Sequence, residues 1–350
     1  MLTARYMGNR EIGIHETEPE SPRPGQVQID VAYAGICGTD LHVLHGDMDG
    51  RMSLPAIIGH EMSGVIAALG DGVTGWNVGD HVTVMPLDWD GTCPACRAGN
   101  QHICHHLNVI GIDLPGALQR LWNVNADHLV ALPQDLRLDH AALVEPVAVA
   151  VHDVRRAELA AGDRAVVIGG GPIGALIAVV ARQAGAEVVV VEIGAQRRQS
   201  VAALGFVVLD PTTTDQVAWV DGWTGGTGAD TVFEVSSAAA AVLGATDLVK
   251  ARGTIVIVAI HTRPRPIDLQ RVFLRELRIL GARVYQRTDF ERAVELLTTG
   301  LIPADALITR IEPITATAQA FAALETGVAM KVLIDVSSTG PSVRARGVRG

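Results

Sequence analysis

The strongest constraint on the fold is a glycine-rich turn between a strand-like run and a helix-like run. Residues 165–192 read AVVIGGGPIGALIAVVARQAGAEVVVVE, which sets three glycines in G-x-G-x-x-G spacing. After a strand and before a helix, this spacing predicts a tight turn whose backbone can approach a pyrophosphate, with free N–H groups at the helix start. The residues expected to contact a dinucleotide here are Gly169, Gly171, Pro172, Ile173 and Gly174.

The choice of dinucleotide depends on the residue that ends the next strand-like run, Glu192. A carboxylate at this place can accept hydrogen bonds from both ribose hydroxyls and repels a 2′-phosphate, which favours NAD over NADP. Arg197 and Arg198 follow closely and could stack on the adenine or weaken that preference. The alternative is a glycine turn in an ordinary α/β domain. The complete strand–turn–helix–strand context argues against it.

The pattern of predicted secondary structure changes near residue 165. Before it, short strand-like runs are separated by turn signals, which predicts a strand-dominated, barrel-like domain. After it, strand-like runs alternate with Ala/Leu-rich helical stretches, as in βαβ units around a parallel sheet. We therefore predict an α/β protein with a β-rich domain over 1–152, completed by about 290–340, a nucleotide-binding domain over 153–289, and a loose tail at 337–350.

Composition excludes several classes of partner. The formal net charge of −10 argues against nucleic acid, because phosphate binding needs a basic surface. No apolar run reaches the length of a membrane span, and charges interrupt the first residues before a signal-peptide pattern can form. We expect a soluble, cytoplasmic protein that acts on a small molecule.

The four cysteines fall into two clusters with other metal-binding residue types. Cys37 lies in GICGTDLH, and the motif GHEMSG that follows contains His60 and Glu61. A thiolate, an imidazole and a carboxylate are all ligands that zinc accepts. The other three cysteines lie within 12 residues, where a cytosolic chain more often binds metal than forms disulfides.

Together these motifs resemble the medium-chain, zinc-dependent dehydrogenases, in particular the sorbitol, butanediol and threonine dehydrogenase branch. The resemblance extends from GICGTD through GHE and the cysteine lobe to GGGPIG. It implies a GroES-like catalytic domain followed by a doubly wound Rossmann domain. It also implies NAD-linked interconversion of a secondary alcohol and its ketone by hydride transfer, in a homo-oligomer for which a tetramer is favoured over a dimer.

The resemblance also implies roles for individual residues. Cys37 and His60 would be ligands of a catalytic zinc, and Glu61 a third or exchanging ligand. Glu145, in VEPVAVAVH, stands where the polyol branch has a glutamate, and would bind the zinc directly or through its water. Thr39 would contact the substrate hydroxyl and His42 would pass the proton to solvent, although His42 could equally be an ordinary surface histidine.

The second cluster, DWDGTCPACRAGNQHIC, resembles the structural zinc lobe of the same family, which has four cysteines in C-x2-C-x2-C-x7-C spacing. Cys93, Cys96 and Cys104 match the last three positions, and Asp90 stands at the first. Zinc accepts a carboxylate, so Asp90 is the expected fourth ligand. The rival donors for that place are His102, His105 and His106, and a lobe without metal is the remaining alternative.

The substrate is less constrained than the reaction. Sorbitol dehydrogenases have a tyrosine where this chain has Val43, so a diol, another polyol, a cyclitol or a sugar is favoured over sorbitol. An enzyme similar to L-threonine 3-dehydrogenase is an alternative, although those enzymes usually have an aspartate in place of Glu145. A non-catalytic NADH-binding sensor is a further alternative, against which the intact site motifs argue.

Overall fold

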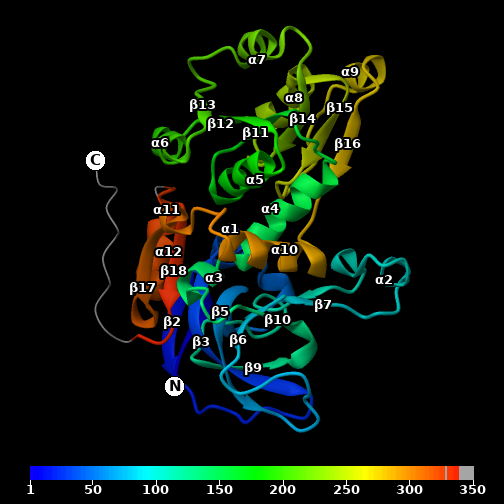
Figure 1. Cartoon of the computed structure of the whole chain (residues 1–350). Helices are drawn as coiled ribbons and strands as arrows, with labels where there is room; N and C mark the ends of the chain where they lie inside the picture. Colours follow the sequence, from blue (N-terminus) through cyan, green and yellow to red (C-terminus); the bar gives the residue numbers. More distant parts are fainter. Residues whose placement is uncertain (328, 339–350) are drawn as a thin grey trace. The chain divides into compact units, whose positions relative to one another are not determined.

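The computed structural model describes residues 1–327 and 329–338, and it divides into two compact units (Figure 1). The discontinuous unit comprises Met1–Glu145 and Gln286–Gly350, and the continuous unit comprises Pro146–Tyr285. From residue 339 on, the predicted loose tail lies outside the described residues. Within the described part of the chain, no helix is long and apolar enough to cross a membrane.

The continuous unit is built on a six-stranded, wholly parallel sheet in the order β13-β12-β11-β14-β15-β16. Its strands are β11 (Arg164–Ile168), β12 (Glu187–Val191), β13 (Val207–Leu209), β14 (Ala229–Glu234), β15 (Val249–Ile257) and β16 (Arg278–Gly281). Its helices are α5 (Pro172–Gln183), α6 (Ala195–Ala203), α7 (Gln216–Thr224), α8 (Ala239–Leu248) and α9 (Leu269–Leu274), while α4 (Val144–Arg156) begins at the unit boundary.

The strands of this sheet are apolar, which is typical of a parallel sheet covered by helices. Val166, Val232 and Ile255 are completely buried, as expected when helices cover a parallel sheet. Helix α5 packs on β11 and β12, and α8 packs on β14 and β15. The predicted doubly wound fold is confirmed. Since the chain order reverses between β11 and β14, the crevice at the carboxyl ends of these strands is where such folds bind a dinucleotide.

The discontinuous unit is rich in strands. Its strands are β1 (Leu2–Gly8), β2 (Glu11–Glu16), β3 (Gln26–Ile36), β4 (Ala56–Ile57), β5 (Glu61–Leu69), β6 (His81–Val84), β7 (Leu87–Asp88), β8 (Asn108–Val109), β9 (Leu121–Asn125), β10 (Leu129–Ala131), β17 (Ile308–Pro313) and β18 (Lys331–Asp335). Its α-helices are α1 (Gly38–Leu44), α2 (Pro94–Arg97), α3 (Leu138–Ala141), α10 (Arg287–Thr298), α11 (Ala304–Leu307) and α12 (Thr317–Glu325). Its 3-10 turns are η1 (Asp49–Arg51), η2 (Gln101–Ile103), η3 (Ala126–His128) and η4 (Ile314–Ala316).

The last described strand returns to a sheet that the first third of the chain begins. The main sheet has the order β10-β6-β5-β3-β18-β17, and β9 also pairs with β3. Strand β18 runs antiparallel to β3, with Val332 opposite Ile36. The side chains of Val332, Leu333 and Ile334 are completely buried. The sequence predicts the strand at Lys331–Val336, but only the fold shows that its partner is β3.

The discontinuous unit has its own hydrophobic core, which includes Ile29, Val31, Met62, Trp122 and Phe321.

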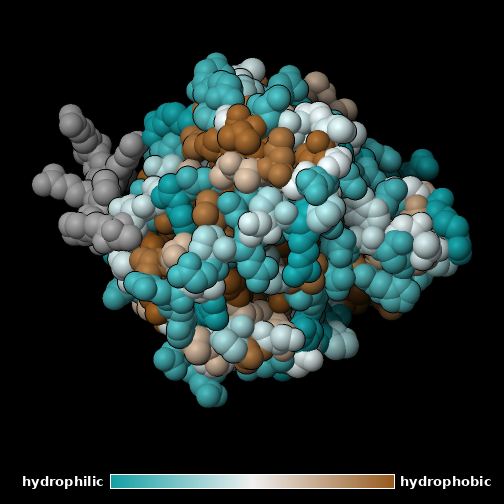
Figure 2. Space-filling model, turned by 90° about the horizontal axis from the view of Figure 1, so that it is seen from below, coloured by the Kyte–Doolittle hydropathy of each residue, from teal (hydrophilic) through white to brown (hydrophobic). Residues whose placement is uncertain are grey.

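On the face shown in Figure 2, hydrophilic side chains surround smaller areas of hydrophobic ones. That is the ordinary pattern of a protein surface, to which apolar atoms contribute about half of the accessible area.

Close packing at the glycine turn leads to a testable prediction about stability. A Cβ at Gly174 would lie 1.8 Å from the carbonyl oxygen of Gly169, whereas a Cβ at Gly222, in helix α7, would meet nothing within 4 Å. Gly174→Ala should therefore lower the free energy of unfolding by about 1–3 kcal/mol through overpacking. Gly222→Ala should raise it by about 0.5–1 kcal/mol through helix propensity. Urea denaturation of both variants checks this, and equal effects would contradict the packing argument.

Candidate active site, metal centres and dinucleotide turn

Strand register assembles the first metal-binding group. Strand β3 ends at Ile36, Cys37 caps helix α1, and β3 pairs with β5 so that Gly35 lies opposite Glu61. His60 directly precedes β5. The ligand atoms of Cys37, His60 and Glu61 all lie within 4.8 Å of one another. A Cβ on Gly35 would lie 2.1 Å from Oε2 of Glu61, so any larger residue would displace this carboxylate from its position beside Lys331.

The surroundings of His60 suit a metal ligand. Its side chain is buried, and its Nδ1 lies 3.5 Å from Oδ1 of the buried Asp40. The other oxygen of Asp40 accepts the backbone N–H of Cys37 at 2.8 Å. Burial alone would lower the pKa of His60, but Asp40 and Cys37 outweigh it and raise the pKa. A carboxylate behind a ligating imidazole is the usual support of a metal-bound histidine, so the donor set fits zinc.

Lys331 belongs to this site, although the sequence motifs do not reveal it. Its Nζ lies 2.7 Å from both carboxylate oxygens of Glu61 and donates to the carbonyl of Ile36 at 3.3 Å. Burial would lower the pKa of Lys331, but Glu61, Cys37 and Glu145 outweigh it and raise the pKa. One signal could have found it. The chain has only two lysines, Lys250 and Lys331, and the second interrupts an apolar strand.

The remaining predicted residues of this site lie outside the three-residue group. Glu145 is buried in the first turn of α4, and its charge contributes to the raised pKa of Lys331. The hydroxyl oxygen of Thr39 lies 3.8 Å from the sulfur of Cys37. His42 is 40% exposed, and its Nδ1 lies 2.8 Å from a carboxylate oxygen of Asp47. Thr39 is thus close to the ligands, whereas His42 reaches solvent.

The second metal-binding group lies in a lobe closed by the short pair β7 and β8. Asp90, Cys93, Cys96 and Cys104 hold their ligand atoms within 4.8 Å of one another, and the three thiols are free. Backbone N–H groups of Cys96 and His105 point at the sulfur of Cys93, at 3.4 and 3.5 Å. The N–H of His105 lowers the pKa of Cys93 to about 7, while burial raises the pKa of Cys96 to about 12.

Among the described residues, the fourth member of this group is Asp90 rather than one of the three rival histidines. One oxygen of Asp90 accepts the N–H groups of Thr92 and Cys93, at 2.8 and 2.9 Å. The other lies 2.6 Å from Nδ1 of His106. These contacts, His106 first, hold the pKa of Asp90 well below its usual range. A carboxylate kept ionised beside three thiols is a donor set that zinc accepts.

The glycine turn has the geometry that dinucleotide binding needs. Gly169 has a φ of +113°, a backbone conformation that residues other than glycine rarely adopt. Gly171 is the N-cap of α5, and no side-chain cap hydrogen bond forms at the start of this helix. Glu192 follows β12, and its two oxygens accept the N–H groups of Gly170 and Gly194, at 2.7 and 2.6 Å. The carboxylate is thereby fixed beside the turn.

The two arginines after Glu192 differ in their surroundings. Arg198 pairs with Asp210 at 2.7 Å and donates to the carbonyl of Glu192 at 3.1 Å. Its guanidinium is therefore engaged within the unit. Arg197 lies near the turn, since a Cβ on Gly171 would be 3.9 Å from its NH1 nitrogen. A contact of Arg197 with a dinucleotide stays a prediction.

Two protein families match the sequence. "Alcohol dehydrogenase GroES-like domain" matches residues 23–134, and "Zinc-binding dehydrogenase" matches residues 172–299. The 2-dehydro-3-deoxy-L-galactonate 5-dehydrogenase of Pseudoalteromonas atlantica is 48% identical over 97% of this chain and 99% of its own length. The L-galactonate-5-dehydrogenase of Escherichia coli is 32% identical over 86% of this chain and 89% of its own.

A solved structure is similar throughout. The 2R,3R-butanediol dehydrogenase of Bacillus subtilis superposes with a TM-score of 0.88 and 31% identity, over 95% of this chain and 99% of that one.

The Lys331–Glu61 pair predicts an asymmetric effect of the two lysines on stability. Lys331→Met leaves a buried carboxylate without its cation and should lower the free energy of unfolding of the metal-free protein by about 3–5 kcal/mol. Lys250→Met breaks a partly exposed pair with Asp230 and should cost at most about 1 kcal/mol. Urea denaturation after chelation measures both. Adding Glu61→Gln should restore most of the loss at Lys331, and equal costs at the two lysines would refute the assignment.

Proposed function

The chain belongs to the zinc-dependent medium-chain alcohol dehydrogenases, and from this premise we propose that it oxidises a secondary hydroxyl of a sugar acid, or reduces the matching ketone, with NAD(H). The observation that carries the choice of substrate is the 48% identity with a sugar-acid dehydrogenase over nearly the whole of both chains. The E. coli relative named for L-galactonate supports the same class. Polyols and diols, on which other relatives act, are the wider class.

We propose that Cys37 and His60 hold the catalytic zinc, with Glu61 as a third or exchanging ligand. The proposal is supported by the proximity of the three ligand atoms and by Lys331, which gives Glu61 a partner whenever it is not bound to metal. Zinc, when bound, lowers the pKa of a hydroxyl next to it. Glu145 remains the second candidate for a carboxylate contact, directly or through water.

The chain's own residues would bind and move the proton. Thr39 lies beside the ligand sulfur, where its hydroxyl can accept the substrate proton. His42 is held by Asp47 at 2.8 Å and is exposed enough to release a proton to water. The hydride transfer itself is the chemistry of the nicotinamide, for which the protein supplies orientation and excludes water.

Glu192 supports NAD as the cofactor, because a carboxylate held beside the glycine turn would repel a 2′-phosphate. The expected nucleotide contacts from Gly169 to Gly174, and from Arg197, belong to the same proposal. We assign a second, structural zinc to Asp90, Cys93, Cys96 and Cys104, which resemble a closed four-ligand site.

Two alternative functions have less support from the sequence and the site. An L-threonine 3-dehydrogenase-like enzyme would be expected to have aspartate at Glu145. A non-catalytic sensor would not need the buried, charge-balanced group around Cys37.

We further propose a cytoplasmic homo-oligomer, with a tetramer favoured over a dimer. The exposed apolar residues of α9, Leu269, Phe273 and Leu274, are of the kind that subunit contacts cover.

Cys37→Ser should separate catalysis from cofactor binding. Removing the thiolate should lower kcat/KM for L-galactonate at least about 1,000-fold, because catalysis then lacks a firm metal ligand. The dissociation constant for NADH, measured by fluorescence, should stay unchanged. Metal analysis should find two zinc ions in the wild type and fewer in the variant. Full activity in Cys37→Ser, or in chelated wild type, would overturn the zinc mechanism.

Glu192→Ala should weaken discrimination between the two dinucleotides. Loss of the carboxylate should lower kcat/KM with NAD by about tenfold or more and raise it with NADP. The control is Glu187→Ala, at the exposed start of the same strand, which should change neither value. Unchanged NAD/NADP preference in Glu192→Ala would contradict the assignment.

A further inference from the structure

The continuous unit contains a cavity of about 490 Å³ that the dinucleotide turn does not use. It lies beside the end of β15, helix α8 and the edge strand β16. In the sheet, β15 is two positions away from β11, which carries the glycine turn, and on the side opposite β12 and Glu192. None of the residues that line the cavity belongs to the glycine turn.

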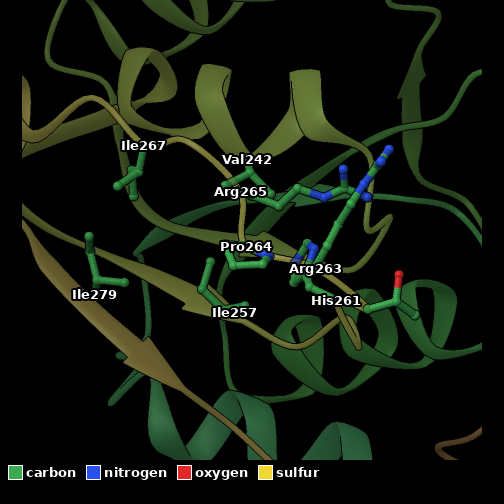
Figure 3. Close-up of a pocket in the computed structure, with 9 residues that line it drawn as sticks. Val242, Ile257, His261, Arg263, Pro264, Arg265, Ile267 and Ile279 are labelled. Atoms are coloured by element: carbon green, nitrogen blue, oxygen red, sulfur yellow. The ribbon is translucent and has the colours of Figure 1, made fainter.

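The cavity has an apolar wall and a cationic end. Val242, Ile257, Ile267 and Ile279 form the wall. In Figure 3, Ile267 and Ile279 lie on one side, whereas the side chains of Arg263 and Arg265 extend toward the other. A ligand that fits both ends combines a carbon skeleton with a negative group.

No ion pair within the described residues explains why Arg263 and Arg265 lie together here. Among the residues that the structure describes, neither Arg263 nor Arg265 forms an ion pair, in a chain whose acidic residues outnumber its basic ones by 38 to 28. Arg265 donates only a long hydrogen bond, of 3.5 Å, to the carbonyl of Ser237, and its buried Nε has no partner within the described chain. A buried guanidinium N–H without an acceptor is costly, which points to an acceptor on a ligand.

The loop that carries the arginines is anchored. Nε2 of His261 lies 3.0 Å from the carboxylate of Glu234, which is completely buried at the end of β14. The second oxygen of Glu234 accepts the N–H and the hydroxyl of Ser236, at 2.9 and 2.7 Å. Glu234 thus anchors the loop through His261, and among the described residues it forms no ion pair with Arg263 or Arg265. Fixing one end of the loop reduces the entropy that the arginines lose on binding a ligand.

We propose that this pocket binds a small organic acid, with its carboxylate on Arg263 and Arg265 and its carbon chain along the apolar wall. Guanidinium groups bind carboxylates with charge-assisted, often bidentate hydrogen bonds. The inference rests on the proposed function only for the choice of probe, L-galactonate. The same arginines could bind a phosphate group, and the diphosphate of the dinucleotide is the obvious alternative source of one.

The test is calorimetric titration of the zinc-loaded, full-length protein with L-galactonate in the absence of dinucleotide, so that no turnover is needed. The wild type should bind L-galactonate at two sites, the catalytic one and this pocket, and Arg263→Gln/Arg265→Gln should weaken binding at one of them by about tenfold or more, since two charge-assisted contacts are lost. Arg252→Gln is the control, because Arg252 is 82% exposed on the same unit and pairs with Glu276. Galactitol, which has no carboxylate, should bind equally to all three proteins. The dissociation constant for NADH should also be the same in all three.

Several outcomes would overturn the proposal. They are a wild type that does not bind L-galactonate, a double variant that binds it normally, and a double variant that loses L-galactonate and galactitol alike. Loss of NADH binding with normal L-galactonate binding would assign the arginines to the diphosphate instead. A wild type that binds L-galactonate through these arginines but never oxidises it would refute the proposed function and leave this site standing.

Discussion

The buried ion pair between Lys331 and Glu61 is the interaction on which the discontinuous unit depends most. Both side chains are almost completely buried, and a buried charge is tolerated only beside its counter-charge. Lys331 comes from the last described strand, and Glu61 begins β5, which lies on the other side of β3. If β18 detached, the carboxylate of Glu61 would lose the ammonium group that balances its charge. The return of the chain to its first sheet is thus coupled energetically to the integrity of the candidate catalytic site.

Backbone N–H groups order the other negative groups. Asp40 accepts the N–H of Cys37, Glu192 accepts two N–H groups around the glycine turn, and the sulfur of Cys93 accepts two more. Each contact fixes the direction in which its acceptor points. Loops, which are elsewhere the variable parts of a fold, are here held by the groups that they present. The ligands therefore have little freedom left to lose when a metal or a dinucleotide binds.

These features suit a dehydrogenase acting on an acidic substrate. The zinc ligands are assembled by the register of β3 and β5, and the dinucleotide turn by the reversal of strand order at β11. An organic acid also needs a positive group that binds its carboxylate. Arg263 and Arg265, which form no ion pair among the described residues, would provide one. The proposed organic-acid pocket lies within the continuous unit, in a part of the chain that contributes neither zinc ligand nor glycine turn.

Local patterns sufficed for much of the fold and for part of the candidate site. Strand β12 coincides with the run Glu187–Val191, and the G-x-G-x-x-G spacing predicts the turn before α5, because strand periodicity and glycine conformation are properties of adjacent residues. The cysteine spacing likewise indicates which residues form the lobe. Partners distant in sequence were decided only by the tertiary structure: Lys331 beside Glu61, Asp40 behind His60, and β18 on β3. No local pattern specifies such pairs, because their energies depend on burial, and burial exists only once the chain has folded.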